Sequence, residues 1–170
     1  MLDNTNQTWY SLRMNVNCYN TCAVFGHREI EITYELKIDL KNTFIDLITN
    51  KNVGIFYLGG FGQFDKLCWE IITELKQTHF SHIKRIYVCE NEDYINRPHK
   101  RPKWLKQEDY EEIIHFSLDF NYWYTRIYYR NIAIIEHSDF ALFYIRNTEN
   151  SGAYKAYKYA IKNKKNIILL

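Results

Sequence analysis

The sequence lacks any apolar run long enough to cross a membrane, and its N-terminus is polar. We therefore expect a cytoplasmic protein with no membrane partner. An excess of one charge is missing too, because 22 Lys and Arg residues face 20 Asp and Glu residues, for a net charge of +2. A protein that coats DNA normally carries a concentrated basic face, so the composition disfavours a nucleic-acid partner.

The sequence also lacks a set of Cys and His residues at metal-ligand spacing. Cys18 and Cys22 lie close together, but no second pair completes a zinc site. These two residues, with Cys68 and Cys89, lie mostly in apolar stretches, which favours buried free thiols in a reducing compartment. We expect no metal and no cofactor.

Two familiar phosphate-binding motifs are absent. The dinucleotide fingerprint G-x-G-x-x-G is not met, and no G-K-[ST] of a P-loop occurs. This excludes ordinary NAD-dependent oxidoreductases and P-loop ATPases. Glycine is scarce, yet three of the six glycines lie together at Gly59, Gly60 and Gly62.

These three glycines lie in residues 53–70, where an apolar run, a glycine turn and a helical pattern follow one another. Glycines let the backbone come close to a ligand, and the N–H groups of a first helical turn favour an anion. The stretch therefore predicts either a phosphate-binding corner or a tight strand-to-helix turn without a ligand.

Apolar periodicity divides the chain into alternating strands and helices, which is typical of a parallel sheet covered by helices. The predicted strands are residues 21–25, 54–58, 83–89, 139–145 and 166–170. The predicted helices are residues 29–50, 64–78, 122–137 and 151–163, with a short one around 107–115. The fold class is thus α/β: a Rossmann-like three-layer sandwich with a mostly parallel five-stranded sheet and helices on both faces.

One domain is expected over residues 21–170, preceded by an N-terminal extension over residues 1–20. Residues 90–120 interrupt the alternation and predict a flap at the ligand end of the sheet. In a parallel sheet all carboxyl ends lie on one edge, so corners at residues 26–28, 59–65 and 146–153 would face one crevice beside the first strand. Together they predict a site for a phosphorylated ligand.

Five segments resemble the SLOG superfamily, whose Rossmann-like domains are related to the DNA-processing protein DprA and the "lonely guy" cytokinin-activating enzymes. They are CAVFGHR at 22–28, FYLGGFGQFDKLCWE at 56–70, YYRN at 128–131, SDFALFYI at 138–145 and SGAYKAYKYA at 151–160. The likeness covers residues 21–170. It implies a crevice that binds nucleotides or nucleotide-derived signals.

The resemblance also implies which residues bind the ligand. Phosphate contacts would come from the glycines of two corners: Gly59, Gly60, Gly62 and Gly152. Polar contacts or supports would come from side chains at and near the corners: His27, Arg28, Asp65, Arg130 and Asn131. The remaining members of the predicted site are neighbours of these residues: Gly26, Phe61, Phe64, Ser151 and Ala153.

The chain departs from the hydrolases of this superfamily, which carry P-G-G-x-G-T-x-x-E with a glutamate at the glycosidic bond. Here Lys66 occupies the glutamate position, and only Asp65 and Glu70 lie near it. Related deoxyribosyltransferases have a nucleophilic glutamate in G-T-x-x-E, whereas residues 152–156 contain no carboxylate. Cleavage of an N-glycoside requires a carboxylate near the anomeric carbon.

The sequence therefore favours a protein that senses or sequesters a nucleotide-derived molecule without chemistry. Examples are a cyclic ADP-ribose-type or cyclic nucleotide immune signal, in an antiphage or anti-defence role. The alternative is a phosphoribohydrolase that uses Asp65 or Glu70. A homo-oligomer is expected, with helix faces and the N-terminal arm at the subunit contacts.

Overall fold

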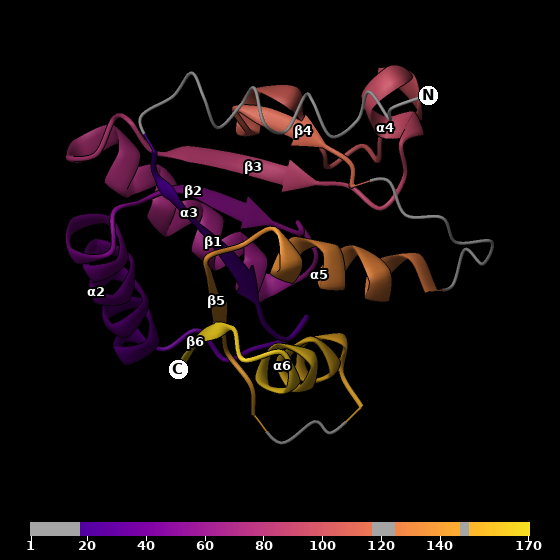
Figure 1. Ribbon diagram of the computed structural model, residues 1–170. Coiled ribbons are helices and arrows are strands. Elements are labelled where there is room, and N and C mark those ends of the chain that lie inside the picture. Colours follow the sequence, from indigo (N-terminus) through magenta and orange to yellow (C-terminus); the bar gives the residue numbers. More distant parts are fainter. Residues whose placement is uncertain (1–17, 117–124, 147–149) are drawn as a thin grey trace.

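The computed structural model describes residues 18–116, 125–146 and 150–170 and contains one parallel sheet of six strands (Figure 1). The strands are β1 (Asn20–Phe25), β2 (Val53–Leu58), β3 (Lys84–Val88), β4 (Glu112–Ile114), β5 (Phe140–Phe143) and β6 (Asn166–Leu169). The helices are α2 (Tyr34–Asn50), α3 (Gln63–Thr78), α4 (Asp93–Asn96), α5 (Arg126–Glu136) and α6 (Gly152–Lys162). Two 3-10 turns, Pro98–Lys100 and Gln107–Asp109, follow α4.

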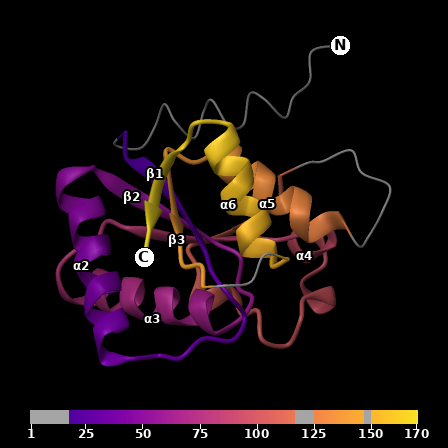
Figure 2. The same ribbon diagram turned by 90° about the horizontal axis from the view of Figure 1, so that it is seen from below.

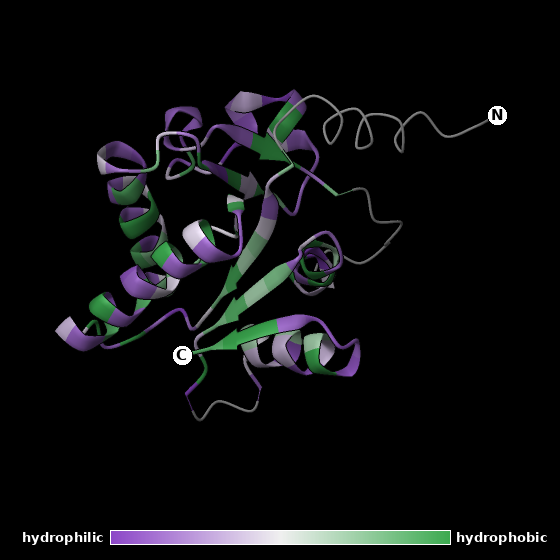
Figure 3. Cartoon of the chain, turned by 60° about the vertical axis from the view of Figure 1, so that its left-hand side comes forward, coloured by the Kyte–Doolittle hydropathy of each residue, from purple (hydrophilic) through white to green (hydrophobic). Residues whose placement is uncertain are grey.

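The chain forms three layers. Helices α2 and α3 cover one face of the sheet, and α5 and α6 cover the other (Figure 2). The central strands are apolar along their length, while the helices carry purple, hydrophilic residues on part of their surface (Figure 3). This is the pattern of strands buried on both faces, and it confirms the predicted α/β architecture.

The strand order is β4-β3-β2-β1-β5-β6, so β1 lies between β2 and β5. Ala23 of β1 pairs with Tyr57 on one side and with Ala141 on the other. From β1 the chain builds outward through β2, β3 and β4, and then returns to build β5 and β6 on the opposite side. The carboxyl ends of β2, β1 and β5 are therefore neighbours at the point where the order reverses.

The sheet has six strands rather than the predicted five, because a strand stands where a short helix was expected around residues 107–115. Glu112–Ile114 forms β4 and pairs in parallel with β3. Only residues 107–109 are helical, as a 3-10 turn. The helical prediction was wrong because pairing with the open edge of β3 decides the conformation of so short a segment.

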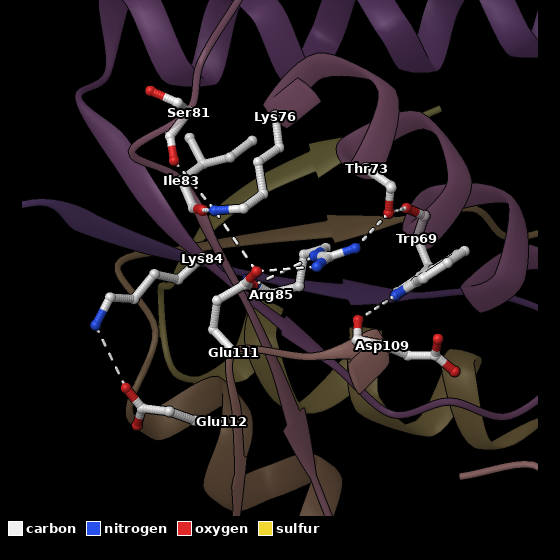
Figure 4. Close-up of polar contacts among 10 residues, drawn as sticks. All are labelled: Trp69, Thr73, Lys76, Ser81, Ile83, Lys84, Arg85, Asp109, Glu111 and Glu112. Carbon is white, nitrogen blue, oxygen red and sulfur yellow. Dashed lines mark hydrogen bonds and ion pairs between the residues drawn. The ribbon is translucent and has the colours of Figure 1, made fainter. Parts of the chain in front are cut away.

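A cluster of polar side chains fastens β4 to β3 and α3 (Figure 4). The Arg85 side chain donates from Nη2 to Glu111 Oε1 at 2.9 Å and from Nη1 to Thr73 Oγ1 at 2.7 Å. The backbone N–H of Arg85 donates to Glu111 Oε2 at 2.6 Å, and Lys76 Nζ lies 3.5 Å from Glu111 Oε1. This cluster holds together the side of the sheet that bears the edge strand β4.

Helix α2 begins at Tyr34, five residues later than predicted. Thr33 caps it, since its Oγ1 accepts from Leu36 N–H at 3.1 Å. The preceding residues stay non-helical, and Ile30 N–H donates to the Gln63 side chain at 2.8 Å. Glu29 and Glu31 therefore do not lie in a first helical turn, contrary to the prediction.

The remaining predicted boundaries differ by a few residues at the ends of the elements. Helix α5 begins at Arg126, and residues 122–124 of the predicted helix lie outside the described residues. Residues 1–17 of the predicted N-terminal extension also lie outside them, and Asn20 already belongs to β1.

Three of the four cysteines, Cys22, Cys68 and Cys89, are buried free thiols as predicted, whereas Cys18 is exposed. Among the described helices, none has the length and apolar character needed to cross a membrane.

Candidate functional site

A pocket of about 720 Å³ opens at the carboxyl ends of β1, β2 and β5. The residues that follow these three strands form most of its wall, together with the inner side of α5 and the start of α6. The predicted site residues in this wall are Gly26, His27, Arg28, Gly59, Phe61, Asp65, Arg130, Asn131, Ser151, Gly152 and Ala153. The three corners inferred from the sequence thus surround one pocket.

The corner after β1 is hydrogen-bonded to the segments that follow β2 and β5. A Cβ built on Gly26 would lie 2.3 Å from the ring of Phe64, so only glycine lets this turn approach α3. His27 Nε2 accepts a hydrogen bond from the backbone N–H of Arg146 at 2.9 Å. The backbone carbonyl of Arg28 accepts from Gln63 N–H at 2.8 Å. The first corner therefore connects the second and third.

The glycine loop after β2 depends on two residues with positive φ, Gly60 at 70° and Gly62 at 95°. A Cβ on Gly62 would lie 2.5 Å from Arg28 Cα, and one on Gly60 would lie 2.5 Å from the ring of Tyr87. Neither glycine lines the pocket. Both are required for close packing of the loop, whereas Gly59 faces the cavity.

Asp65 lies in the first turn of α3 and is 8% exposed. Its Oδ2 accepts from Phe61 N–H at 2.7 Å and so braces the glycine loop. Burial raises the pKa of Asp65 to about 6, although the Phe61 hydrogen bond and the charge of Arg130 act in the opposite direction. The pocket thus contains a carboxyl group that titrates near neutral pH.

Arg130 belongs to α5 and is 6% exposed, and its side chain reaches from this helix to the glycine loop. Its Nη1 donates to the carbonyl of Gly59 at 3.1 Å, and Nη2 donates to Asn131 Oδ1 at 3.0 Å. The guanidinium also lies over the ring of Phe61, 5.2 Å from its centroid.

Two acids follow Arg130 in the chain, Glu136 and Asp139, and either could in principle form an ion pair with it. Both acids have other partners. Glu136 accepts from Lys165 Nζ at 3.0 Å and from Tyr159 Oη at 2.8 Å. Asp139 accepts from the backbone N–H of Thr21 at 2.8 Å. The carboxylate that pairs with Arg130 is instead Glu90, 3.9 Å away.

The third corner supplies the N-terminus of α6. Ser151 is the N-cap, and its Oγ accepts from Tyr154 N–H at 3.1 Å. A Cβ on Gly152 would meet no atom of the described residues within 4 Å. The space in front of this helix end is therefore open to the pocket, where the helix dipole favours an anionic group.

Four predicted residues do not line the pocket: Gly60, Gly62, Phe64 and Glu70. Phe64 is fully buried and stacks on Tyr144 at 5.2 Å between ring centroids. Glu70 is half-exposed and pairs with the exposed Lys66 at 3.8 Å. The position of the hydrolase glutamate thus carries a lysine that points to solvent.

The sequence analysis missed several wall residues: Val24, Phe25, Glu29, Ile30, Glu31, Ile127 and Tyr144. It included Arg146 in the third corner but did not name it as a site residue. Arg146 is the most informative, because its exposed guanidinium lies 5.2 Å from the centroid of the Tyr144 ring at the pocket. Its position directly after the predicted strand 139–145 was a usable signal. Glu29 and Glu31 were not predicted as wall residues because the sequence analysis assigned them to the helix over residues 29–50.

The chemistry of the wall is mixed. Arg28, Arg130 and Arg146 favour anions, Glu29 and Glu31 accept hydrogen bonds from hydroxyl or amino groups, and Phe61 offers an aromatic face. No group of three or more His, Cys, Asp or Glu side chains in the described part of the chain could hold a metal ion.

Comparison with solved structures finds this fold in several proteins, among them two DNA processing proteins and a carrier protein. DNA processing protein A from Streptococcus pneumoniae superimposes with a TM-score of 0.58 at 11% identity, over 89% of this chain and 50% of that one. DNA processing protein A from Helicobacter pylori, described for its single-stranded DNA binding mode, superimposes with a TM-score of 0.56 at 17% identity, over 88% of this chain and 64% of that one. The Moco carrier protein from Chlamydomonas reinhardtii superimposes with a TM-score of 0.50 at 15% identity, over 89% of this chain and 76% of that one.

This chain therefore corresponds to half of one DNA processing protein and to less than two thirds of the other. At these identities the likeness concerns the fold. No protein-family model and no curated protein sequence matches the chain.

Proposed function

We propose, from the premise that this chain has the SLOG-type Rossmann fold of DprA, that it binds a nucleotide-derived small molecule and senses or sequesters it without cleaving it. The pocket at the carboxyl ends of β1, β2 and β5 is the binding site. Its volume of about 720 Å³ is typical of a small-molecule site and exceeds what one phosphate needs.

The wall supports an anionic ligand with a polar, ring-bearing part. Arg28, Arg146 and the open N-terminus of α6 attract a phosphate group. Glu29 and Glu31 are hydrogen-bond acceptors suited to sugar hydroxyls. Phe61 presents an aromatic ring to the same cavity. A nucleotide combines these three chemical features.

The observation that carries binding rather than cleavage is the state of Asp65 and Glu70, the two carboxylates nearest to the position of the hydrolase glutamate. Asp65 is committed to bracing the loop through Phe61 N–H, and Glu70 pairs with Lys66 outside the pocket. Neither is placed as a free carboxylate for an oxocarbenium-like charge. The Moco carrier protein, whose name describes transport of a small molecule, is one of the chains with this fold.

The test begins with the ligand that co-purifies. Protein denatured by heat is expected to release an intact nucleotide, which mass spectrometry identifies. Titration calorimetry with AMP and ADP-ribose then measures affinity. Arg146→Ala is expected to weaken binding at least about tenfold, as for loss of a charge-assisted hydrogen bond.

The matched control is Arg97→Ala, because Arg97 is exposed, pairs with Asp93 and lies outside the pocket wall. Equal effects of the two substitutions, or no binding of any nucleotide, would contradict the proposal.

One observation favours a second function, a phosphoribohydrolase. Asp65 lines the pocket and its pKa of about 6 suits a general acid near neutral pH. Incubation with nucleoside monophosphates, followed by chromatography for the free base, tests it. Release of base by the wild type, abolished in Asp65→Asn and retained in Glu70→Gln, would establish the hydrolase and overturn the binding proposal.

A further inference from the structure

A second hollow of about 170 Å³ lies at the carboxyl ends of β3 and β4. Residues that follow these strands and the first turns of α5 form its wall, including Glu90, Glu92, His115, Arg126 and Arg130. Figure 1 shows the arrowheads of β3 and β4 pointing toward α4. Because the strands are parallel, these ends lie on the edge of the sheet at which the main pocket opens.

Arg130 belongs to the walls of both hollows. Its guanidinium donates to Gly59 at the main pocket and lies 3.9 Å from Glu90 at the second hollow. Because the side chain is buried and held by Asn131 as well, it is a fixed boundary between the two cavities. A ligand that reaches across Arg130 would occupy both.

The two hollows differ in the groups that could hold a phosphate. The main pocket has Arg28, Arg146 and the N-terminus of α6, which favour phosphate. In the second hollow the carboxylates of Glu90 and Glu92 are balanced by the guanidinium groups of Arg126 and Arg130, so its wall favours an uncharged polar group.

His115 strengthens the acceptor character of the second hollow. Burial lowers the pKa of His115, although Glu92 and Glu90 act against this shift, so its imidazole is neutral at pH 7. A neutral imidazole has one acceptor nitrogen. With the guanidinium of Arg126 as a donor and Glu92 and His115 as acceptors, the wall suits an uncharged group that both donates and accepts, which describes the hydroxyls of a pentose or the polar edge of a base.

Size gives a further restriction. The second hollow has less than a quarter of the volume of the main pocket, about 170 against about 720 Å³. It accommodates one ring rather than a complete nucleotide.

We propose that the second hollow is a subsite for an uncharged sugar or base ring, and that the ligand is a nucleotide carrying such a ring beyond its phosphates. This inference rests on the proposed binding function and specifies its ligand class. The phosphates lie in the main pocket, and the second ring lies on the other side of the Arg130 side chain, beside Glu92 and His115. The expected ligands are nucleoside diphosphate sugars and dinucleotides rather than mononucleotides.

The test compares ADP with ADP-ribose, which differ by the terminal ribose. Titration calorimetry with the full chain is expected to show at least about tenfold tighter binding of ADP-ribose, since the added hydroxyls gain one or two hydrogen bonds. Glu92→Gln and His115→Ala are expected to remove this advantage and to leave the affinity for ADP unchanged.

Glu108→Gln and His99→Ala are the matched controls, because both residues are exposed and lie outside the hollow. Equal affinities for ADP and ADP-ribose, or equal losses for both ligands in the variants, would refute the subsite while leaving the main pocket intact. If neither compound binds and Arg146→Ala changes nothing, the binding function itself is wrong and the subsite falls with it.

Discussion

Arg130 and Gly59 are in direct contact across the floor of the pocket. The Nη1 of Arg130 donates to the Gly59 carbonyl at 3.1 Å, and a Cβ added to Gly59 would lie 2.9 Å from Nη2. The guanidinium is buried and bonded to Asn131, so it has little freedom to move away. The absence of a side chain at residue 59 thus leaves room for Arg130, which lines both hollows.

The first prediction concerns this contact. Gly59→Ala is expected to displace the Arg130 guanidinium and to weaken nucleotide binding at least about tenfold, because a charge-assisted contact is lost. Calorimetry measures the affinity and thermal unfolding measures the fold. Unchanged affinity in a folded variant would mean that Arg130 does not contact the ligand.

The second prediction concerns Gly62 and Gly152, to both of which the sequence analysis assigned phosphate contacts. Gly62→Ala is expected to destabilise the protein by about 2 kcal/mol or more, since φ is 95° and the new Cβ would lie 2.5 Å from Arg28 Cα. Gly152→Ala meets no neighbour and is expected to keep the stability while reducing ligand binding. Urea unfolding with calorimetry checks both. Similar losses of stability in the two variants would contradict the assignment.

The third prediction is a pH dependence. The pKa of Asp65 is about 6 in the folded protein against an ordinary value of 3.8. Between these two pH values the folded state therefore binds more protons than the unfolded state. The contribution of Asp65 to stability is therefore present below pH 3.8 and is lost as pH rises through about 6. At about 1.4 kcal/mol per pKa unit, the loss is about 3 kcal/mol.

Asp65→Asn tests this dependence, because the amide keeps an acceptor for Phe61 N–H and removes the charge. The variant is expected to lose less stability than the wild type between pH 4 and pH 6.5, as followed by chemical denaturation at a series of pH values. Parallel stability profiles for the two proteins would show that Asp65 titrates normally.

The fourth prediction compares two ion pairs that join β3 to the segment leading into β4. Glu111→Gln removes the charged partner of Arg85, which is 8% exposed, and is expected to cost about 3 kcal/mol or more. Glu112→Gln breaks the more exposed pair with Lys84 and is expected to cost less than about 1 kcal/mol. Denaturant unfolding measures both, and equal costs would contradict the distinction.

The Glu111 pair also gives a pH dependence of the opposite sign. Burial acts to raise the pKa of Glu111, but the hydrogen bonds and charge of Arg85, with Lys76, outweigh it and hold the pKa below its ordinary value of 4.5. The stabilisation is therefore complete above pH 4.5 and is lost as pH falls through the lower, folded pKa. Glu111→Gln is expected to abolish this acid-side loss.

The sequence by itself determined the alternation of apolar strands and amphipathic helices, and with it the parallel sheet. Strands such as β2 and β5 are apolar throughout because both faces are buried, and this signal is local. The parallel arrangement in turn brought the corners at Gly26, Gly59 and Ser151 to one edge, and the structure surrounds one pocket with them.

Only the tertiary structure decided what depends on contacts between distant segments. Strand β4 forms because β3 offers an open edge, and Glu29 and Glu31 face the pocket because Gln63 binds Ile30 N–H before α2 begins. Phe64 is core rather than wall because it fills the space beside Gly26. No local pattern contains these partners, since free energy of pairing and packing comes from residues far away in the chain.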